Sequence, residues 1–238
     1  NFERKIHFDG CNYTISNLHS DETTYGGGVG KYPSLFGVLY GSCQNLKVVD
    51  AVIDGTSQAI GIIGGYIGTT GKTASLKNVS VTGEVNGTNH RAGGYAGQVV
   101  EATFEDCDAD VTVKGKQAVG GFAGKVTGTC SFKGCDVKAS VTTIYTEKHQ
   151  TGGFIGYLDG STITVESCNL LEGSTVTDGS SVTETVVSSI GGFFGWAGAS
   201  DKVDVKNTSA SVAVNAPYAR NVGGFIGVIG KGTFKTSG

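Results

Sequence analysis

The pentapeptide Gly-Gly-aromatic-x-Gly recurs six times along this chain, and a degraded seventh copy, Pro-Ser-Leu-Phe-Gly, opens at Pro33. The complete copies open at Gly64, Gly93, Gly120, Gly152, Gly191 and Gly223, so the intervals counted from Pro33 are 31, 29, 27, 32, 39 and 32 residues. Recurrence at such a period indicates a solenoid or array in which each repeat packs on its neighbours. The fold of the whole chain must therefore follow from one unit.

Each pentapeptide is followed by a short turn and then by a fixed pattern of apolar, polar, polar, variable, polar and apolar residues. The six copies of this pattern begin at Cys43, Leu76, Phe104, Phe132, Val165 and Val205. Short runs rich in Val and Thr follow, and no stretch has a sustained helical period. A unit of about 30 residues with three short strands is one coil of a parallel β-helix. We therefore expect an all-β, right-handed parallel β-helix, or β-solenoid, of about seven coils.

Glycine is the commonest residue at the repeat column, and two explanations for it stay open. Either the corner there needs a positive φ, or two backbone segments approach each other closely. The chain has 40 Gly among 238 residues but only 2 Pro and no Met, which fits a rod of stacked strands. Most units are too short for the blades of a β-propeller, and no leucine-rich repeat pattern occurs.

The repeats run on without a break in composition, so we expect one domain with a distinct start. Residues 1–30 are predicted to form an N-terminal cap and the first coil, since an open solenoid end needs protection from edge pairing. Residues 31–238 are predicted to be β-helix repeats. Phe234 falls where the next apolar column should begin, so we expect the sequence to stop inside a coil of a longer protein; a frayed natural last coil is the alternative.

The segment Phe8-Asp-Gly-Cys-Asn-Tyr-Thr-Ile-Ser-Asn-Leu18 is similar to the start of bacterial surface proteins with GLUG-motif repeats, and the later Gly-Gly-Phe-x-Gly units resemble the GLUG motif itself. The resemblance covers nearly the whole chain, with Phe or Tyr where Leu is common. It implies a β-solenoid in an extracellular or bacterial cell-surface protein. GLUG repeats also occur in non-catalytic parts of IgA1-specific metallopeptidases.

Three of the six cysteines, Cys107, Cys135 and Cys168, share one apolar column, where Leu, Val and Thr stand in other copies. This interchange favours free buried thiols over a disulfide framework, although neighbouring members of a ladder lie close enough for one bridge. No Cys-x-x-Cys pair or Cys/His cluster occurs, so we expect no metal and no cofactor.

Catalytic motifs are missing: the sequence has no His-Glu-x-x-His, no Gly-x-Ser-x-Gly and no P-loop. Five carboxylates do cluster between Glu101 and Asp110, which keeps open a polysaccharide lyase or glycoside hydrolase of the β-helix type. However, stacking the coils predicts a column of alternating charge, which weakens the catalytic interpretation. This column consists of Lys77, Glu105, Lys133, Glu166 and Lys206.

The loops before each Gly-Gly and the positions just after each pentapeptide offer a binding surface. Aromatic, amide and basic side chains gather there, a mixture that suits carbohydrate; the plainer alternative is variable solvated loops. The candidate ligand-binding residues are Tyr145, His149, Tyr157, Trp196, Tyr218 and Arg220. Gln98 and Lys125 fall in the same positions as Tyr157 and Trp196, on what we expect to be an exposed turn.

The formal net charge of −3 and the lack of basic runs argue against nucleic acid as a partner, and no apolar stretch is long enough to span a membrane. The sequence therefore predicts a non-catalytic domain for adhesion, glycan binding or rigid spacing. Its partner would be a host or microbial glycan or a surface protein. A carbohydrate-active enzyme is the alternative.

Overall fold

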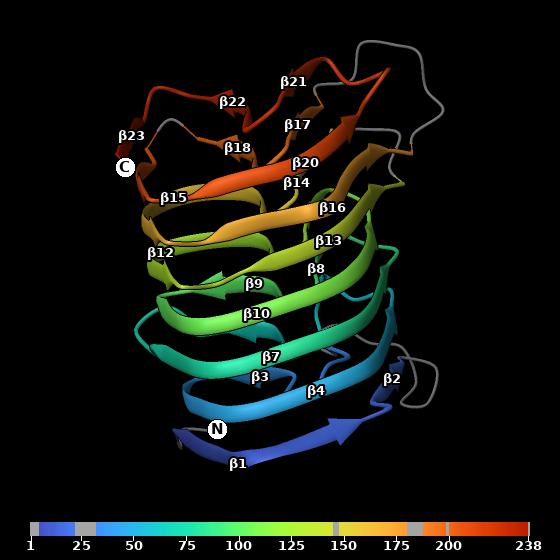
Figure 1. The fold of residues 1–238 in the computed structure, drawn as a ribbon, viewed down its shortest axis with the longest axis vertical. Coiled ribbons are helices and arrows are strands. Elements are labelled where there is room, and N and C mark those ends of the chain that lie inside the picture. The colour runs from blue at the N-terminus through green and yellow to red at the C-terminus, as the bar shows by residue number, and fades with distance from the viewer. Residues whose placement is uncertain (1–4, 22–31, 145–147, 180–187, 199, 238) are drawn as a thin grey trace.

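The computed structural model describes residues 5–21, 32–144, 148–179, 188–198 and 200–237, and within these ranges the chain is all-β with no helix. The strands stack in parallel as a β-solenoid of about seven coils (Figure 1), which confirms the expected fold. A 17-stranded sheet wraps most of each coil, and a six-stranded sheet of short strands closes it.

The long face of the solenoid begins with β1, β4, β7 and β10, and its later coils divide the same path between two strands. Its strands are β1 (Ile6–Ser16), β2 (His19–Asp21), β4 (Gly41–Gly55), β7 (Ala74–Gly87), β10 (Ala102–Gly115), β12 (Ala123–Lys133), β13 (Val137–Thr143), β15 (Ile155–Glu166), β16 (Asn169–Asp178), β19 (Lys202–Lys206), β20 (Ser209–Asn215) and β23 (Thr233–Ser237). β1 and β2 both pair with β4, so residues 6–21 belong to the first coil.

The remaining strands flank the glycine pentapeptides. The strands that lead out of the pentapeptides and join the large sheet are β3 (Val38–Leu39), β6 (Gly64–Ile67), β9 (Ala96–Val100), β18 (Phe194–Ala197) and β22 (Ile226–Ile229), together with the first parts of β12 and β15. The strands that lead into them form the small sheet: β5 (Ala59–Ile60), β8 (Arg91–Gly93), β11 (Ala118–Gly120), β14 (Gln150–Gly152), β17 (Ser189–Gly191) and β21 (Asn221–Gly223).

The aromatic residue of the pentapeptide points into the core and stacks on its equivalent in the next coil. The rings of Tyr95, Phe122, Phe154, Phe193 and Phe225 form a continuous stack with centroid separations of 4.5, 5.1, 4.6 and 5.1 Å. Phe104 and Phe132, also stacked, meet this column edge to face. Offset stacks and edge contacts are the favoured aromatic geometries, and here they occupy the middle of the core.

The copy of the pentapeptide that opens at Gly64 is out of register with the rest. Gly64 pairs with Ala96 and Ile60 with Ala92, so Gly61, not Gly64, is the equivalent of Gly93. This coil places Ile63 in the aromatic column and leaves Tyr66 outside. Residues 60–68 contain glycines that fit the repeat whether it is counted from Gly61 or from Gly64. The structure adopts the first alignment, in which Ile62 and Ile63 are buried. In the degraded copy Val38 pairs with Tyr66, so this copy keeps the register of the five aligned copies, and the backbone N of Phe36 donates to the Ile63 carbonyl.

The structure also distinguishes between the two explanations for glycine at the repeat, a positive φ and a close approach of two backbone segments. None of the glycines in the five aligned pentapeptides, from Gly93 to Gly227, has a positive φ. Instead the last glycine of each copy lies against the small sheet: a Cβ added to Gly156 would lie 2.6 Å from the backbone N of Val119, and one added to Gly124 would lie 2.7 Å from the backbone O of Ala118. Close backbone approach, and not a positive φ at a corner, therefore explains why glycine occupies these positions in each copy.

The corner with positive φ lies elsewhere, at the third residue of the apolar-polar-polar pattern. Its members are Asn45, Asn78, Asp106, Gly134, Ser167 and Asn207, with φ between 47° and 61°. Asn and Asp adopt the left-handed region more readily than other non-glycine residues. The side chains also bond along the column, since Asn78 Nδ2 donates to Asn45 Oδ1 at 3.0 Å. This asparagine-rich column turns the chain from one side of the coil to the next.

The predicted apolar and charged columns are confirmed in register. Leu76, Phe104 and Phe132 pair in sequence, as do Lys77, Glu105, Lys133, Glu166 and Lys206. Within this charged column, Lys77 Nζ lies 3.1 Å from Glu105 Oε1 and forms an ion pair with it. Both side chains are about half exposed. Such a pair contributes little to stability. The expectation that Phe234 begins the next copy of the apolar column is wrong. Phe234 pairs with Val203, whereas Thr236 pairs with Val205, the first apolar residue of the preceding copy.

All six cysteines are free, as expected, and five of them are buried while Cys11 is exposed. Cys135 N donates to the sulfur of Cys168 at 3.3 Å, which places these two in neighbouring coils of the predicted thiol column. Hydrogen bonds with Cys107 and Cys168, together with burial, raise the pKa of Cys135. Burial raises the pKa of Cys43 to about 12 and that of Cys130 to about 11.

Candidate functional site

One column of side chains runs along the outside of the solenoid where the chain leaves the glycine pentapeptides. Successive strand pairs align Tyr66, Gln98, Lys125, Tyr157 and Trp196, with Val38 and Val228 at the two ends. We call the five central residues the outer row. They lie on strands β6, β9, β12, β15 and β18 and not on the exposed turn that the sequence suggested, and Gln98 is only 9% exposed. The four others are partly exposed, so three aromatic residues and one lysine of the row reach the surface.

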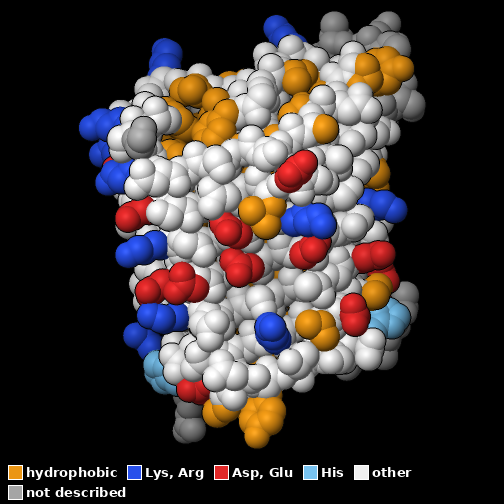
Figure 2. Space-filling model, in the orientation of Figure 1, with side chains coloured by type: hydrophobic (Ala, Val, Ile, Leu, Met, Phe, Trp, Pro, Cys, Tyr) orange, Lys and Arg blue, Asp and Glu red, His pale blue; other side chains and the backbone are white. Residues whose placement is uncertain are grey.

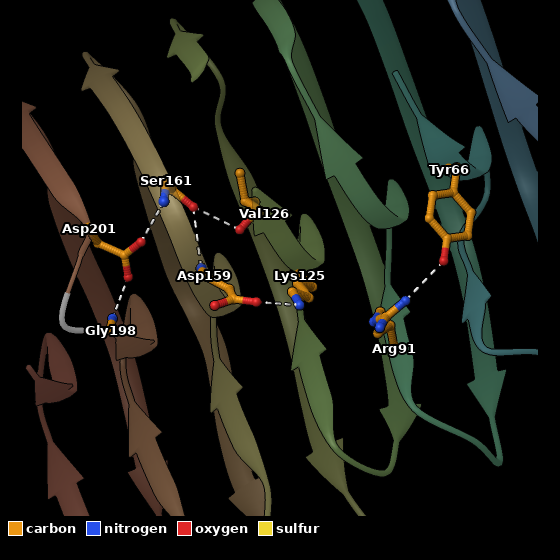
Figure 3. Close-up of polar contacts among 8 residues, drawn as sticks. All are labelled: Tyr66, Arg91, Lys125, Val126, Asp159, Ser161, Gly198 and Asp201. Carbon is orange, nitrogen blue, oxygen red and sulfur yellow. Dashed lines mark hydrogen bonds and ion pairs between the residues drawn. The ribbon is translucent and has the colours of Figure 1, made fainter. Parts of the chain in front are cut away.

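Two cationic side chains, one from β8 of the small sheet and one from the segment before β14, lie against rings of the outer row. Arg91 Nη1 donates to the Tyr66 hydroxyl at 2.9 Å (Figure 3). The ammonium group of Lys148 lies 5.9 Å from the centre of the Trp196 ring. Arg91 begins β8 of the small sheet and Lys148 precedes β14, whereas the row follows the pentapeptides, so the turn at each pentapeptide brings the two sides together.

Lys125 occupies the middle of the row and has two partners from the next coil. Its ammonium group lies 2.7 Å from Asp159 Oδ2 and 5.2 Å from the centre of the Tyr157 ring. The Lys125 side chain is only 15% exposed, so this ion pair is better shielded from solvent than the pairs on the long face. Burial, followed by the charge of Asp159, raises the pKa of Tyr157, which keeps its hydroxyl protonated and able to donate.

A buried carboxylate holds the part of the row that carries Tyr157 and Trp196. Asp201, 1% exposed, accepts hydrogen bonds from the backbone N of Ser161 at 2.6 Å and from the backbone N of Gly198. Ser161 Oγ in turn donates to the Val126 carbonyl at 2.8 Å, which ties three coils together (Figure 3). Ser161 lies four residues after Tyr157 and Gly198 two after Trp196, so Asp201 fixes both rings through their own strands.

The structure places the six candidate residues differently. Tyr157 and Trp196 pair directly in the outer row. His149 is buried, with its Nε2 3.9 Å from Asp178 Oδ1 at the end of β16, so its ring lies below the surface. Tyr218, 51% exposed, and Arg220, also exposed, lie in the segment before β21 in the last coil. Tyr145 lies outside the described residues.

Sequence reasoning missed three residues of this face: Tyr66, Arg91 as a contact of the row, and Asp201. Tyr66 was assigned to the wrong register, which hid its equivalence to Tyr157 and Trp196. Arg91 is one of the basic residues before a Gly-Gly, and nothing in the sequence indicated its contact with Tyr66. Asp201 gives no pattern signal, since a lone Asp before a strand usually caps a turn.

The acidic cluster between Glu101 and Asp110 is tied into the solenoid by its own contacts. Glu105 pairs with Lys77, and Asp110 lies 4.0 Å from Lys138. Asp108 accepts from the backbone N of Asp136 at 3.0 Å, and burial, with the nearby charges of Asp136 and Asp106, raises the pKa of Asp108. Acidic side chains gather at mid-height on the long face in Figure 2, without an enclosing cleft in that view.

Two hollows open near the last coil, and neither holds a pair of carboxylates. One, of about 450 Å³, is lined by Val205, Asn207, Thr208, Ser209, Phe225, Thr236 and Ser237. The other, of about 390 Å³, contains a single carboxylate, Asp204, which pairs with Lys206 at 3.0 Å. Glycoside hydrolysis needs two carboxyl groups across a bound sugar, so these hollows do not supply that chemistry.

In the described ranges, no cluster of three or more His, Cys, Asp or Glu side chains could hold a metal ion, and no helix is long and apolar enough to cross a membrane.

Fold and surface together define a β-solenoid with an outward aromatic and cationic row. The structure is similar to the crystal structure of a candidate immunoglobulin A1 protease from Bacteroides ovatus, with a TM-score of 0.71 and 23% sequence identity over 98% of this chain and 69% of that one. At this identity the likeness shows a shared β-solenoid fold. No family model and no curated protein matches the chain.

Proposed function

We propose that this chain is a non-catalytic, glycan-binding domain of a secreted or cell-surface bacterial protein. The observation that carries the proposal is the outer row, in which Tyr157 and Trp196 lie side by side with polar and cationic partners around them. Flat aromatic faces suit the apolar faces of sugars, and the surrounding donors suit their hydroxyl groups. The resemblance to GLUG-repeat proteins and the shared fold with a candidate immunoglobulin A1 protease support an extracellular setting.

Two features favour binding over hydrolysis. The row follows successive strands along the solenoid with four of its five residues partly exposed. The clustered carboxylates lie on the long face with lysine or backbone partners. A glycosidase would instead need an acid and a base or nucleophile facing one another across a substrate.

The test is a screen of the purified domain on an array of neutral and acidic glycans, with a reducing-end assay on every glycan that binds. We expect binding without new reducing ends. Trp196→Ala and Tyr157→Ala should each weaken binding by about tenfold, since truncation of a Trp or Tyr that makes a central contact commonly costs more than about 1 kcal/mol.

The matched control is Tyr13→Ala, because Tyr13 is 77% exposed on β1, away from the row. This variant should bind as the unaltered domain does. Release of reducing ends would establish an enzyme and overturn the non-catalytic proposal. Absence of binding to every glycan would leave a rigid spacer as the function. Loss of binding only in Tyr218→Ala would move the site to the last coil.

A further inference from the structure

Each exposed ring of the outer row has a cation against it. Arg91 contacts Tyr66, Lys125 contacts Tyr157 and Lys148 contacts Trp196. The three pairs come from different coils, with Gln98 and Lys125 in place of a ring in the two coils between Tyr66 and Tyr157. A neutral sugar needs no such repeated positive charge beside its stacking surface.

The charge of this face is not balanced locally. Asp159 neutralises Lys125, at 2.7 Å. In the part of the chain that the structure describes, no carboxylate lies within ion-pair distance of Arg91 or Lys148. Two cations therefore remain available next to the rings, on a protein whose formal net charge is −3. Arg91 is partly buried against Tyr66, which fixes its guanidinium group in place.

The row has a defined length and direction. Tyr66 and Trp196 are four strand steps apart, and neighbouring strands are about 4.8 Å apart, so the row spans about 19 Å along the solenoid axis. Figure 3 shows the contact of Arg91 with Tyr66 apart from that of Lys125 with Asp159, and the register places Tyr66 two strand steps from Lys125. A single sugar cannot contact both ends, whereas an extended chain of several sugars can.

We propose that the outer row binds a linear, acidic polysaccharide whose chain runs along the solenoid axis. The rings of Tyr66, Tyr157 and Trp196 stack on sugar faces, while Arg91 and Lys148 pair with anionic groups carried at intervals along the chain. This inference rests on the proposed glycan-binding function and adds the charge and shape of the ligand.

The test uses matched polymers that differ only in charge. Polygalacturonate is compared with its fully methyl-esterified form, and dextran sulfate with dextran, by titration calorimetry at low and at physiological salt. We expect binding to at least one acidic polymer, at least tenfold tighter than to its neutral partner. Affinity should fall as salt rises, because partly exposed charges are screened. Oligomers too short to span the row should bind more weakly than longer ones.

The variants Arg91→Gln and Lys148→Gln remove one charge each and keep the rings. Each should weaken binding to the acidic polymer by about threefold to tenfold, and each should reduce its salt dependence. Lys148→Arg should retain binding. Lys47→Gln is the control, since Lys47 is an exposed cation on β4 of the long face. A purely structural role for the two cations would leave the preference for acidic polymers unchanged.

The outcomes separate this inference from the function on which it rests. Binding of neutral glycans that depends on Trp196 but not on salt would overturn the acidic ligand and retain glycan binding. Equal loss in Lys47→Gln would show non-specific attraction of polyanions and would also overturn it. No binding to any glycan on the array or to these polymers would overturn both proposals.

Discussion

At the scale of single residues, the glycines of the repeat and the residues with positive φ occupy different positions of the coil, for different physical reasons. The motif glycines are needed because two backbones approach within contact distance, whereas the positive φ of each coil is carried mainly by Asn, Asp and Ser. A sequence shows that glycine recurs but not which of its two properties is used. The asparagine column could have been found from the repeated Asn at Asn45, Asn78 and Asn207, a residue type that favours the left-handed region.

Gly156→Ala should therefore be far more damaging than Gly160→Ala, although both glycines belong to β15. The Cβ of the first would lie 2.6 Å from the Val119 backbone, whereas the second has a φ of 64° and open space around it. We expect a loss of about 3 kcal/mol or more in the free energy of unfolding for Gly156→Ala and about 1 kcal/mol for Gly160→Ala. Urea denaturation of the two variants measures both values. Equal losses would mean that the dihedral angle, and not close packing, controls these positions.

The thiols give a second prediction at this scale. Burial raises the pKa of Cys43 to about 12 and that of Cys130 to about 11, from 9.0. The neutral thiols thus stabilise the folded state below pH 9, and this contribution falls as pH rises from 9 towards 12, where unfolded thiols ionise first. A thiol reagent at pH 8 should modify Cys11 alone in the folded protein and all six cysteines in urea. Rapid modification of a second cysteine without denaturant would contradict the buried column.

At the scale of the element, the coil was predictable where a pattern repeats and unpredictable where two registers compete. The alternating charges and apolar columns followed from counting, and the structure pairs Lys77 with Glu105 and Glu105 with Lys133 as expected. The segment around Gly64 was misaligned because it contains glycines in two frames, and only packing of Ile63 into the aromatic column selects one. Because of that error the sequence analysis did not identify Tyr66, or its contact with Arg91, as part of the candidate site.

Asn78→Ala tests the corner of the coil. Asn78 has a φ of 52° and donates to Asn45, so alanine loses both the favoured dihedral and the side-chain bond. We expect a loss of about 1–2 kcal/mol in the free energy of unfolding. Ser80→Ala, two residues further along β7, serves as the comparison and should change stability by less than about 0.5 kcal/mol. Similar values for the two variants would show that the corner is not set by this residue.

Asp201 offers a test of how the element supports the site. Asp201→Asn replaces one accepting oxygen with an NH₂ group that faces a backbone N–H, either at Ser161 or at Gly198. We expect a loss of about 1–3 kcal/mol and a shift in the emission of Trp196, the only tryptophan. Glycan affinity should fall with it, although Asp201 itself is buried. Unchanged emission would show that the carboxylate does not position the ring.

At the scale of the whole molecule, the stack of coils makes stability a sum over neighbouring coils, and the ends differ from the middle. Phe154 is fully buried and contacts rings in the coils on both sides, Phe122 and Phe193. Phe225 has such a neighbour on one side, Phe193, and is partly exposed in the last coil, where apolar side chains reach the surface (Figure 2). In a one-dimensional array each coil is stabilised by its interfaces, and within residues 1–238 the coil of Phe225 has one such interface whereas that of Phe154 has two.

Phe154→Ala should consequently cost about 3–5 kcal/mol, the usual range for a buried ring, and Phe225→Ala about half as much. The two variants should also differ in the kind of unfolding. Loss of the inner ring should lower the midpoint of a single cooperative transition, because it weakens the coupling between the two halves of the rod. Loss of the outer ring should free the last coil alone, so that hydrogen exchange accelerates in β20 and β22 while β7 and β10 keep their protection. Uniform acceleration along the whole chain in both variants would contradict coil-by-coil coupling. It would require instead that the solenoid unfold as one unit wherever the core is opened.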